Sequence, residues 1–211
     1  MFDEAYIEET HPIDTKEYEY LTEQRHNKIS TKIRKIYFNK EINYLNGVRH
    51  ACDNFDRYSI NIADFDSSRY QIERQSYREG TYYSTYTYLD KAHCLRMIQG
   101  DTAWMRKYND SLIREMAVWF EINLPKVGVV VDYQRETYHV RYENSMIFFD
   151  SSIRSTYDFT PEELFDPELK MQERLGKHVC VMTYRQKVMV PRVMANLLNY
   201  CDHKMLTVSE S

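Results

Sequence analysis

The segment RYSINIADFDSSRYQIERQSYREGTYYSTYTYL, residues 57–89, decides the fold of this chain. Bulky residues alternate with small or polar ones through most of it, and a period of two is typical of β-strands. The sequence Asp-Ser-Ser at 66–68 and the pair Glu79-Gly80 are typical of turns. The last third consists mainly of tyrosine and threonine, which favour strands. The segment therefore predicts an antiparallel meander of three strands, at 57–65, 69–77 and 81–89.

One face of these strands is apolar or aromatic, and the other face is polar. The polar face carries Ser59, Asn61, Gln71, Glu73 and Gln75. Such a face is either a sheet surface exposed to solvent or the inner wall of a barrel whose outside is covered by helices. The alternation alone leaves both interpretations open.

The rest of the chain continues with strands and helices in a single domain, residues 1–211, without a repeat or a linker. Alternating segments predict further strands at 32–38, 127–140, 145–150 and 178–185. Helical spacing and capping residues predict helices at 12–28, 90–100, 102–122 and 191–201, and a short helix or turn at 159–169. Strands, a helical insert at 90–124, more strands and a last helix are typical of an α+β fold dominated by antiparallel sheet.

The charge of the chain is unevenly distributed. An N-terminal acidic segment, 1–30, starts with eight acidic residues and one lysine within 1–24, whereas seven basic residues and one glutamate follow within 25–49. We interpret these as two oppositely charged solvated faces. The net charge of −4 argues against a nucleic-acid partner that depends on overall positive charge.

The composition also bears on the compartment. No apolar run approaches the ~18–20 residues of a membrane span, and the start MFDEAYIEE resembles no secretion signal. The four cysteines are scattered without a CxxC motif, so we expect reduced thiols in a cytoplasmic protein. His178 with Cys180, and Cys201 with His203, are spaced two apart, but these are not the common zinc spacings, and structural thiols are expected.

A series of motifs runs in order through the chain: KIRKIYF (32–38), RYSINIADF (57–65), YQIERQ (70–75), GTYYSTYTYL (80–89), VVVDYQRETY (129–138), MIFFDSSIR (146–154), LFDP (164–167) and VCVMTY (179–184). In this order they resemble VTC domains, the polyphosphate-polymerase branch of the triphosphate tunnel metalloenzymes in the CYTH-like superfamily. The resemblance covers about residues 30–201. It implies an antiparallel eight-stranded tunnel-like β-barrel with flanking helices.

The resemblance also implies which residues would bind the ligand. Polyphosphate needs inward-pointing lysines and arginines, and its turnover needs carboxylates that hold Mn or Mg. At the positions where the family places these groups, this chain has neutral or acidic residues: Ser59, Asn61, Gln71, Glu73, Met146, Val181 and Thr183. The remaining candidates for the lumen or for ligand binding are Arg34, Arg57, Glu73, Tyr133, Arg135, Asp150 and Arg154.

These replacements favour a VTC-like tunnel domain that has lost its phosphate and metal chemistry. It would have no catalytic residue and no cofactor, and would act as a structural or interaction protein with a protein partner. One alternative is an active polyphosphate polymerase or triphosphatase, with Mn or Mg, that binds polyphosphate or a nucleotide through substituted ligands. A second alternative is a binder of a non-phosphate small molecule or peptide in a tyrosine-rich lumen.

One pairing can be predicted inside the lumen. Glu73 and Arg135 are both expected to project inward, because the alternation places them on polar faces. An unpaired charge in a confined lumen is costly, so we expect the two side chains to pair. The alternative partner for Arg135 is Asp150.

Overall fold

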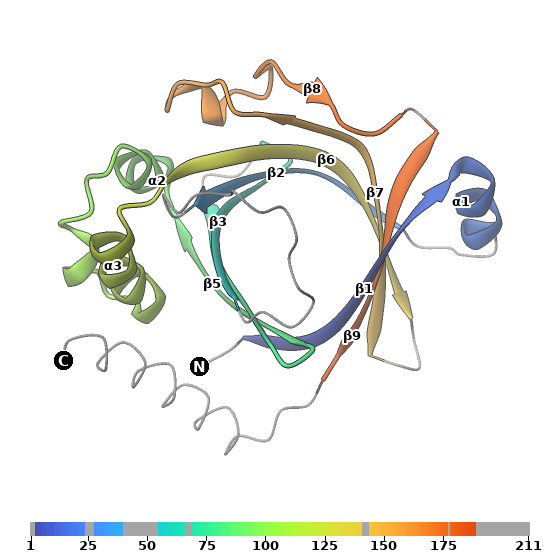
Figure 1. Cartoon of the computed structure of the whole chain (residues 1–211), viewed down its shortest axis with the longest axis horizontal. Helices are drawn as coiled ribbons and strands as arrows, with labels where there is room; N and C mark the ends of the chain where they lie inside the picture. The colour runs from blue at the N-terminus through green and yellow to red at the C-terminus, as the bar shows by residue number, and fades with distance from the viewer. Residues whose placement is uncertain are drawn as a thin grey trace.

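The structure is a computed structural model that describes residues 3–23, 28–39, 55–65, 69–140, 144–176 and 178–188. Within them, eight strands form a closed antiparallel barrel: β1 (Glu4–Asp14), β2 (Ile29–Asn39), β3 (Phe55–Ala63), β4 (Tyr70–Arg78), β5 (Thr81–Leu89), β6 (Lys126–Val140), β7 (Ser145–Thr156) and β9 (Val179–Lys187). Their order around the ring is β6-β2-β3-β4-β5-β1-β9-β7, and pairing of β7 with β6 closes it (Figure 1). A short strand, β8 (Gln172–Glu173), adds to β7.

Three α-helices of the described residues lie outside the ring: α1 (Thr15–Thr22), α2 (Lys91–Ile98) and α3 (Ser111–Asn123). Each begins after an aspartate, namely Asp14, Asp90 or Asp110, whose side chain accepts a hydrogen bond from a backbone N–H three residues further on. Figure 1 shows α2 and α3 on one side of the ring and α1 on the opposite side. None of the helices in the described ranges has the length and apolar character of a membrane span.

The main hydrophobic core lies outside the barrel wall. Outward-facing residues of β2 and β3, such as Ile36 and Ile60, pack with Met97 of α2 and Met116 of α3, and all four are 0–1% exposed. A smaller cluster around Phe149 lies beneath α1. The inner face of the wall is polar, so the alternating residues separate the core from the lumen. This confirms the interpretation of the alternation as a barrel with a polar inside.

The predicted helix at 102–122 is shorter in the structure. It begins at Ser111, because the side chain of Asp110 accepts the backbone N–H of Ile113 and fixes the first turn there. The residues before it form turns and a short 3-10 helix, Met105–Lys107. The helical prediction for 102–110 was therefore wrong, and its apolar residues pack as a loop.

Within the described residues, the predicted helix at 12–28 is represented by α1, which begins at Thr15 rather than at Pro12. Asp14 and Glu17 form a reciprocal capping box that starts the helix at Thr15. The acidic segment before it forms β1, which the sequence analysis did not predict. At 159–169 the chain forms turns and a short 3-10 helix, Glu163–Phe165, as expected. The predicted helix at 191–201 lies outside the described residues.

Replacing Asp110 with alanine is expected to destabilise the fold by about 1–2 kcal/mol. The carboxylate caps α3 through one oxygen and accepts the hydroxyl of Thr87 through the other, at 2.9 Å. The substitution removes both bonds, whereas Asp110→Asn keeps an acceptor for the helix. Urea unfolding measures the difference; an equal loss of stability in both variants would contradict the capping role.

Candidate functional site

The inner wall of the barrel bounds a cavity of about 390 Å³. Its polar lining includes Lys35, Asn61, Gln71, Glu73, Ser84 and Arg135. Its aromatic lining consists of Tyr86, Tyr88 and Tyr133, of which Tyr86 and Tyr88 are 37% and 50% exposed. The cavity is therefore a polar lumen with tyrosines that reach solvent.

Glu73 lies at the centre of a hydrogen-bond network on this wall. Its carboxylate accepts bonds from Lys35 Nζ at 3.1 Å, Asn61 Nδ2 at 3.0 Å and Ser84 Oγ at 2.7 Å. Burial by itself raises the pKa of Glu73, but Lys35 and these hydrogen bonds outweigh it and hold the pKa at about 2. Burial by itself lowers the pKa of Lys35, but the attractions of Glu73, Tyr37 and Tyr133 together outweigh it and raise the pKa. Both groups are therefore charged at neutral pH.

Three other basic residues of the wall also face carboxylates. Arg135 donates two hydrogen bonds to Asp150, both at 2.7 Å, in the bidentate geometry that arginine and carboxylate prefer. Arg185 donates to Glu8 at 3.0 and 2.7 Å. Lys187 donates to Glu4 at 2.7 Å. The wall thus neutralises much of its own charge.

Aromatic rings cover the guanidinium groups along the same wall. The guanidinium carbon of Arg185 lies 3.9 Å from the ring centre of Tyr6 and 5.0 Å from that of Phe148. Arg135 lies 4.5 Å from Phe148 and 5.1 Å from Tyr133. Arginine and aromatic rings therefore alternate from β1 through β9 and β7 to β6, in an order favoured by cation–π attraction.

No protein-family model matches the chain, and no curated protein sequence matches it. Solved structures do match. An adenylate cyclase candidate from Bacillus halodurans is 13% identical, with a TM-score of 0.54 over 99% of this chain and 92% of its own. The Mediator head module of Schizosaccharomyces pombe contains a chain that is 8% identical, with a TM-score of 0.50 over 97% of this chain and 95% of its own.

The chain is a closed, tunnel-like barrel of eight antiparallel strands. The Bacillus structure shares this fold over nearly the whole chain. Identities this low show the fold alone. What the barrel binds therefore depends on the residues of its own wall.

The expected pair of Glu73 with Arg135 does not form in the tunnel barrel. Both residues line the lumen, as predicted, but Glu73 pairs with Lys35 and Arg135 pairs with Asp150. Asp150 lies directly opposite Arg135 in the register of β6 and β7. Arg135 therefore reaches Asp150 more easily than it reaches Glu73. Arg135 therefore takes the partner that we named as its alternative.

Two candidate residues, Arg34 and Arg154, lie on the outer side of the wall. Arg34 is fully buried there; it donates two hydrogen bonds to Asp132 and two to the carbonyls of Leu164 and Asp166. Arg154 donates to the same Asp132 at 3.4 Å. The structure therefore places neither of these lumen or ligand-binding candidates in the lumen, since Arg34 alternates with the lumenal Lys35 and shares the outward face of Ile36 and Phe38.

The remaining candidates are Tyr133 and Arg57. Tyr133 lines the lumen beside Arg135, and burial raises the pKa of its hydroxyl. Arg57 lies over the rings of Tyr37 and Phe55, with ring centres at 5.4 and 5.0 Å. Both are placed where an inward-facing residue is expected.

Sequence reasoning missed several charged residues of the wall: Glu4, Glu8, Lys35, Arg185 and Lys187. Lys35 lies in a motif that was recognised, and its neighbours Ile36 and Phe38 would have identified Lys35 rather than Arg34 as inward-facing. The other four belong to β1 and β9, which pair with each other. Because β1 was not predicted, nothing in the sequence connected them.

The pair formed by His178, in the turn before β9, and Cys180 of β9 does not gather further metal-binding side chains among the described residues. Cys180 is buried in the cluster beneath α1, and burial raises the pKa of its thiol. Among the residues that the structure describes, no three His, Cys, Asp or Glu side chains come together as potential metal ligands. The second pair, Cys201 and His203, lies outside those residues.

Proposed function

We propose that this tunnel barrel is VTC-like in origin, has lost polyphosphate processing and works as a non-catalytic structural or interaction protein. The observation that carries the proposal is the pairing of the basic side chains on the wall with carboxylates of the same wall. Four such pairs link Lys35 to Glu73, Arg135 to Asp150, Arg185 to Glu8 and Lys187 to Glu4. A tunnel that binds polyanions needs these cations for its ligand.

The energetics of phosphate binding support this proposal. A charge-assisted hydrogen bond contributes roughly 1.5–3 kcal/mol, so a phosphate has to match each bond that it breaks. The displaced carboxylates would then lie beside the phosphate and repel it. Glu73 is the strongest case, because it is buried, ionised and held by three donors. The wall is therefore poorly suited to a chain of phosphates.

The residues between these pairs fit the same proposal. Ser59, Asn61 and Gln71 are neutral, and Asn61 donates to Gln71 at 3.2 Å and to Glu73. Thr183 exchanges a hydrogen bond with Thr10 at 3.2 Å. The VTC resemblance leads us to expect cations or a metal-binding carboxylate at these strands. Uncharged groups that bond to one another stabilise the wall instead.

A second candidate function is the binding of an uncharged small molecule in the lumen. The observation that favours it is the cavity itself, with Tyr86 and Tyr88 at its exposed side. Tyrosine rings provide flat contact surfaces, and Asn61 and Gln71 provide amide groups for hydrogen bonds. This candidate and the structural role both differ from an active enzyme, which would have to recruit Mn or Mg through substituted ligands.

Titration calorimetry with tripolyphosphate and Mn²⁺ tests the loss of polyphosphate binding. We expect no binding in the micromolar range at physiological salt, since the wall offers few cations that are not already paired and salt screens the remainder. A malachite-green assay with ATP, tripolyphosphate and Mn²⁺ tests turnover in parallel. Phosphate release above a heat-inactivated control would overturn the proposal, as would micromolar binding.

A double substitution, Glu73→Lys with Val181→Glu, provides the matched comparison. It introduces a lysine at position 73 and a carboxylate at position 181, where the resemblance to VTC domains implies a cation and a metal ligand. We expect this variant to gain measurable affinity for tripolyphosphate and Mn²⁺. The single variant Glu73→Gln controls for the loss of the negative charge alone.

A further inference from the structure

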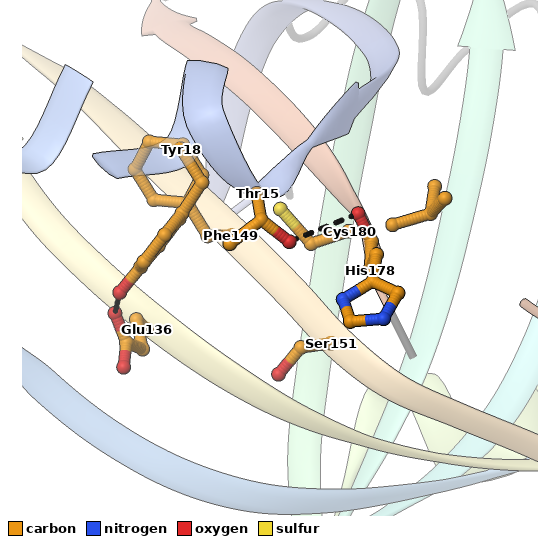
Figure 2. A pocket seen from close by; sticks show the side chains of 8 residues that line it. Thr15, Tyr18, Glu136, Phe149, Ser151, His178 and Cys180 are labelled. Carbon is orange, nitrogen blue, oxygen red and sulfur yellow. Dashed lines mark hydrogen bonds between the residues drawn. The ribbon is translucent and has the colours of Figure 1, made fainter. Parts of the chain in front are cut away.

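A second cavity, of about 240 Å³, lies on the outside of the barrel between α1 and the wall (Figure 2). Its lining comes from α1, β6, β7, β9 and the turn before β9: Thr15, Tyr18, Glu136, Phe149, Ser151, His178, Val179 and Cys180. Glu136 and Cys180 point outward, because their neighbours Arg135 and Val181 belong to the inner wall. The cavity is therefore separated from the lumen by the thickness of the sheet.

The floor and one side of this cavity are aromatic. Phe149 is 1% exposed, and the ring of Tyr18 meets it edge to face at 5.2 Å. Tyr138 meets the same ring at 5.6 Å. No residue of α1 is fully buried, so the helix crosses the wall without filling the space beneath it. A flat apolar group of ligand size fits against such a surface.

One end of the cavity carries a carboxylate that already binds an ammonium group. Glu136 accepts hydrogen bonds from Tyr18 at 2.6 Å, Tyr138 at 3.3 Å and Lys28 Nζ at 2.8 Å. Partial burial opposes ionisation, but the bonds from Lys28 and Tyr18 lower the pKa of Glu136. The side chain of Lys28 is 53% exposed, and exposed ion pairs contribute only about 0–1 kcal/mol. The ammonium group of a ligand can therefore replace that of Lys28 with little loss of stability.

The other end of the cavity carries polar groups without partners in the described part of the chain. The ring of His178 and the hydroxyl of Ser151 make no hydrogen bond there, whereas Thr15 Oγ1 donates to the backbone carbonyl of His178 at 3.2 Å. Figure 2 shows Glu136 and His178 at opposite ends, with Ser151 between them. The cavity thus combines an anionic end, an aromatic floor and an end that carries the hydrogen-bonding groups of His178 and Ser151.

We infer that this cavity binds a small aromatic monoamine. Its ring packs against Phe149 and Tyr18, and its ammonium group takes the place of Lys28 on Glu136. A ring N–H or hydroxyl of the ligand bonds to His178 or Ser151. The acidic surface of α1 and its C-cap, with Glu17, Glu19 and Glu23, favours the approach of a cation.

Titration calorimetry of the full chain with three indoles tests this inference: tryptamine, neutral 3-methylindole and anionic indole-3-acetate. We expect tryptamine to bind about tenfold or more tightly than indole-3-acetate, because a charge-assisted hydrogen bond contributes roughly 1.5–3 kcal/mol. Glu136→Gln should remove this preference, and Ser151→Trp should abolish binding by filling the cavity. Amide chemical-shift changes in the unmodified protein should centre on the residues of the cavity.

The control is Glu19→Gln, which removes an exposed acid from α1 without touching the cavity. It should bind tryptamine within about twofold of the unmodified protein, because solvent and salt screen an exposed charge. Equal weakening in Glu19→Gln and Glu136→Gln would overturn the inference, since only the general field of α1 would then matter. Undetectable tryptamine binding, or shift changes confined to the lumen, would overturn it as well.

Discussion

Replacing Arg34 with methionine is expected to destabilise the barrel by about 3–5 kcal/mol, because removal of one partner leaves a buried charge without compensation. Arg34 is fully buried and holds both oxygens of Asp132, at 2.7 and 2.9 Å. It also donates to the carbonyls of Leu164 and Asp166, which fixes the 3-10 helix Glu163–Phe165 and the residue after it to β2. The substitution leaves all of these acceptors without their donor.

Urea unfolding measures this loss, and Arg154→Met is the matched control. Arg154 bonds to the same Asp132, but at 3.4 Å and with a side chain that is 45% exposed. Its removal should lower stability by no more than about 1 kcal/mol. The double variant Arg34→Met with Asp132→Leu should recover part of the loss, since it removes the unpaired carboxylate. Similar losses in the two single arginine variants would contradict the central role of Arg34.

The second large effect expected is a loss of stability between pH 4.5 and pH 2 through Glu73. Its pKa is about 2 in the folded barrel, against an ordinary value of 4.5. Unfolding therefore takes up a proton in this range, and the stabilisation present above pH 4.5 disappears as the pH falls toward 2. A pKa difference of this size corresponds to roughly 3 kcal/mol in the free energy of unfolding.

Urea unfolding at a series of pH values tests this dependence. Glu73→Gln should be less stable than the unmodified barrel at pH 7, because Lys35 loses its partner, and its stability should fall less steeply below pH 4.5. Glu168→Gln, which changes an exposed glutamate, should leave the slope as it is. An unchanged slope in Glu73→Gln would show that another carboxylate dominates the acid response.

Much of the fold follows from local patterns. Alternation predicted β3, β4 and β5 within about two residues, because each buries one face against helices and turns the other to a polar lumen. β1 was not predicted, because its inward positions include the charged residues Glu4 and Glu8. The wall tolerates these two carboxylates only because Lys187 and Arg185 of β9 pair with them. That compensation depends on tertiary pairing, which a local pattern does not contain.

For the site, the sequence predicted which of several residues face inward but not which partners they bind. Glu73, Tyr133 and Arg135 were placed correctly on the inner wall, since the period of two fixes the face. The choice of partner was not fixed, because it depends on strand register: Asp150 lies opposite Arg135, and Lys35 reaches Glu73 through β3. Arg34 shows the other limit, since a motif match says little about the side of the wall that a residue faces.

The closure of the ring between β1 and β9 has a consequence for how the protein reaches this structure. Thr10 and Thr183, which meet across this seam, are 173 positions apart in sequence. Contacts of such high sequence separation slow folding, because the loop entropy is lost before the pairing compensates for it. The hairpins of β3, β4 and β5 can assemble early from neighbouring residues, whereas the seam has to wait for β9. Until then, β1 and β7, the two partners of β9, present open strand edges, and this interval is when the chain is most exposed to aggregation.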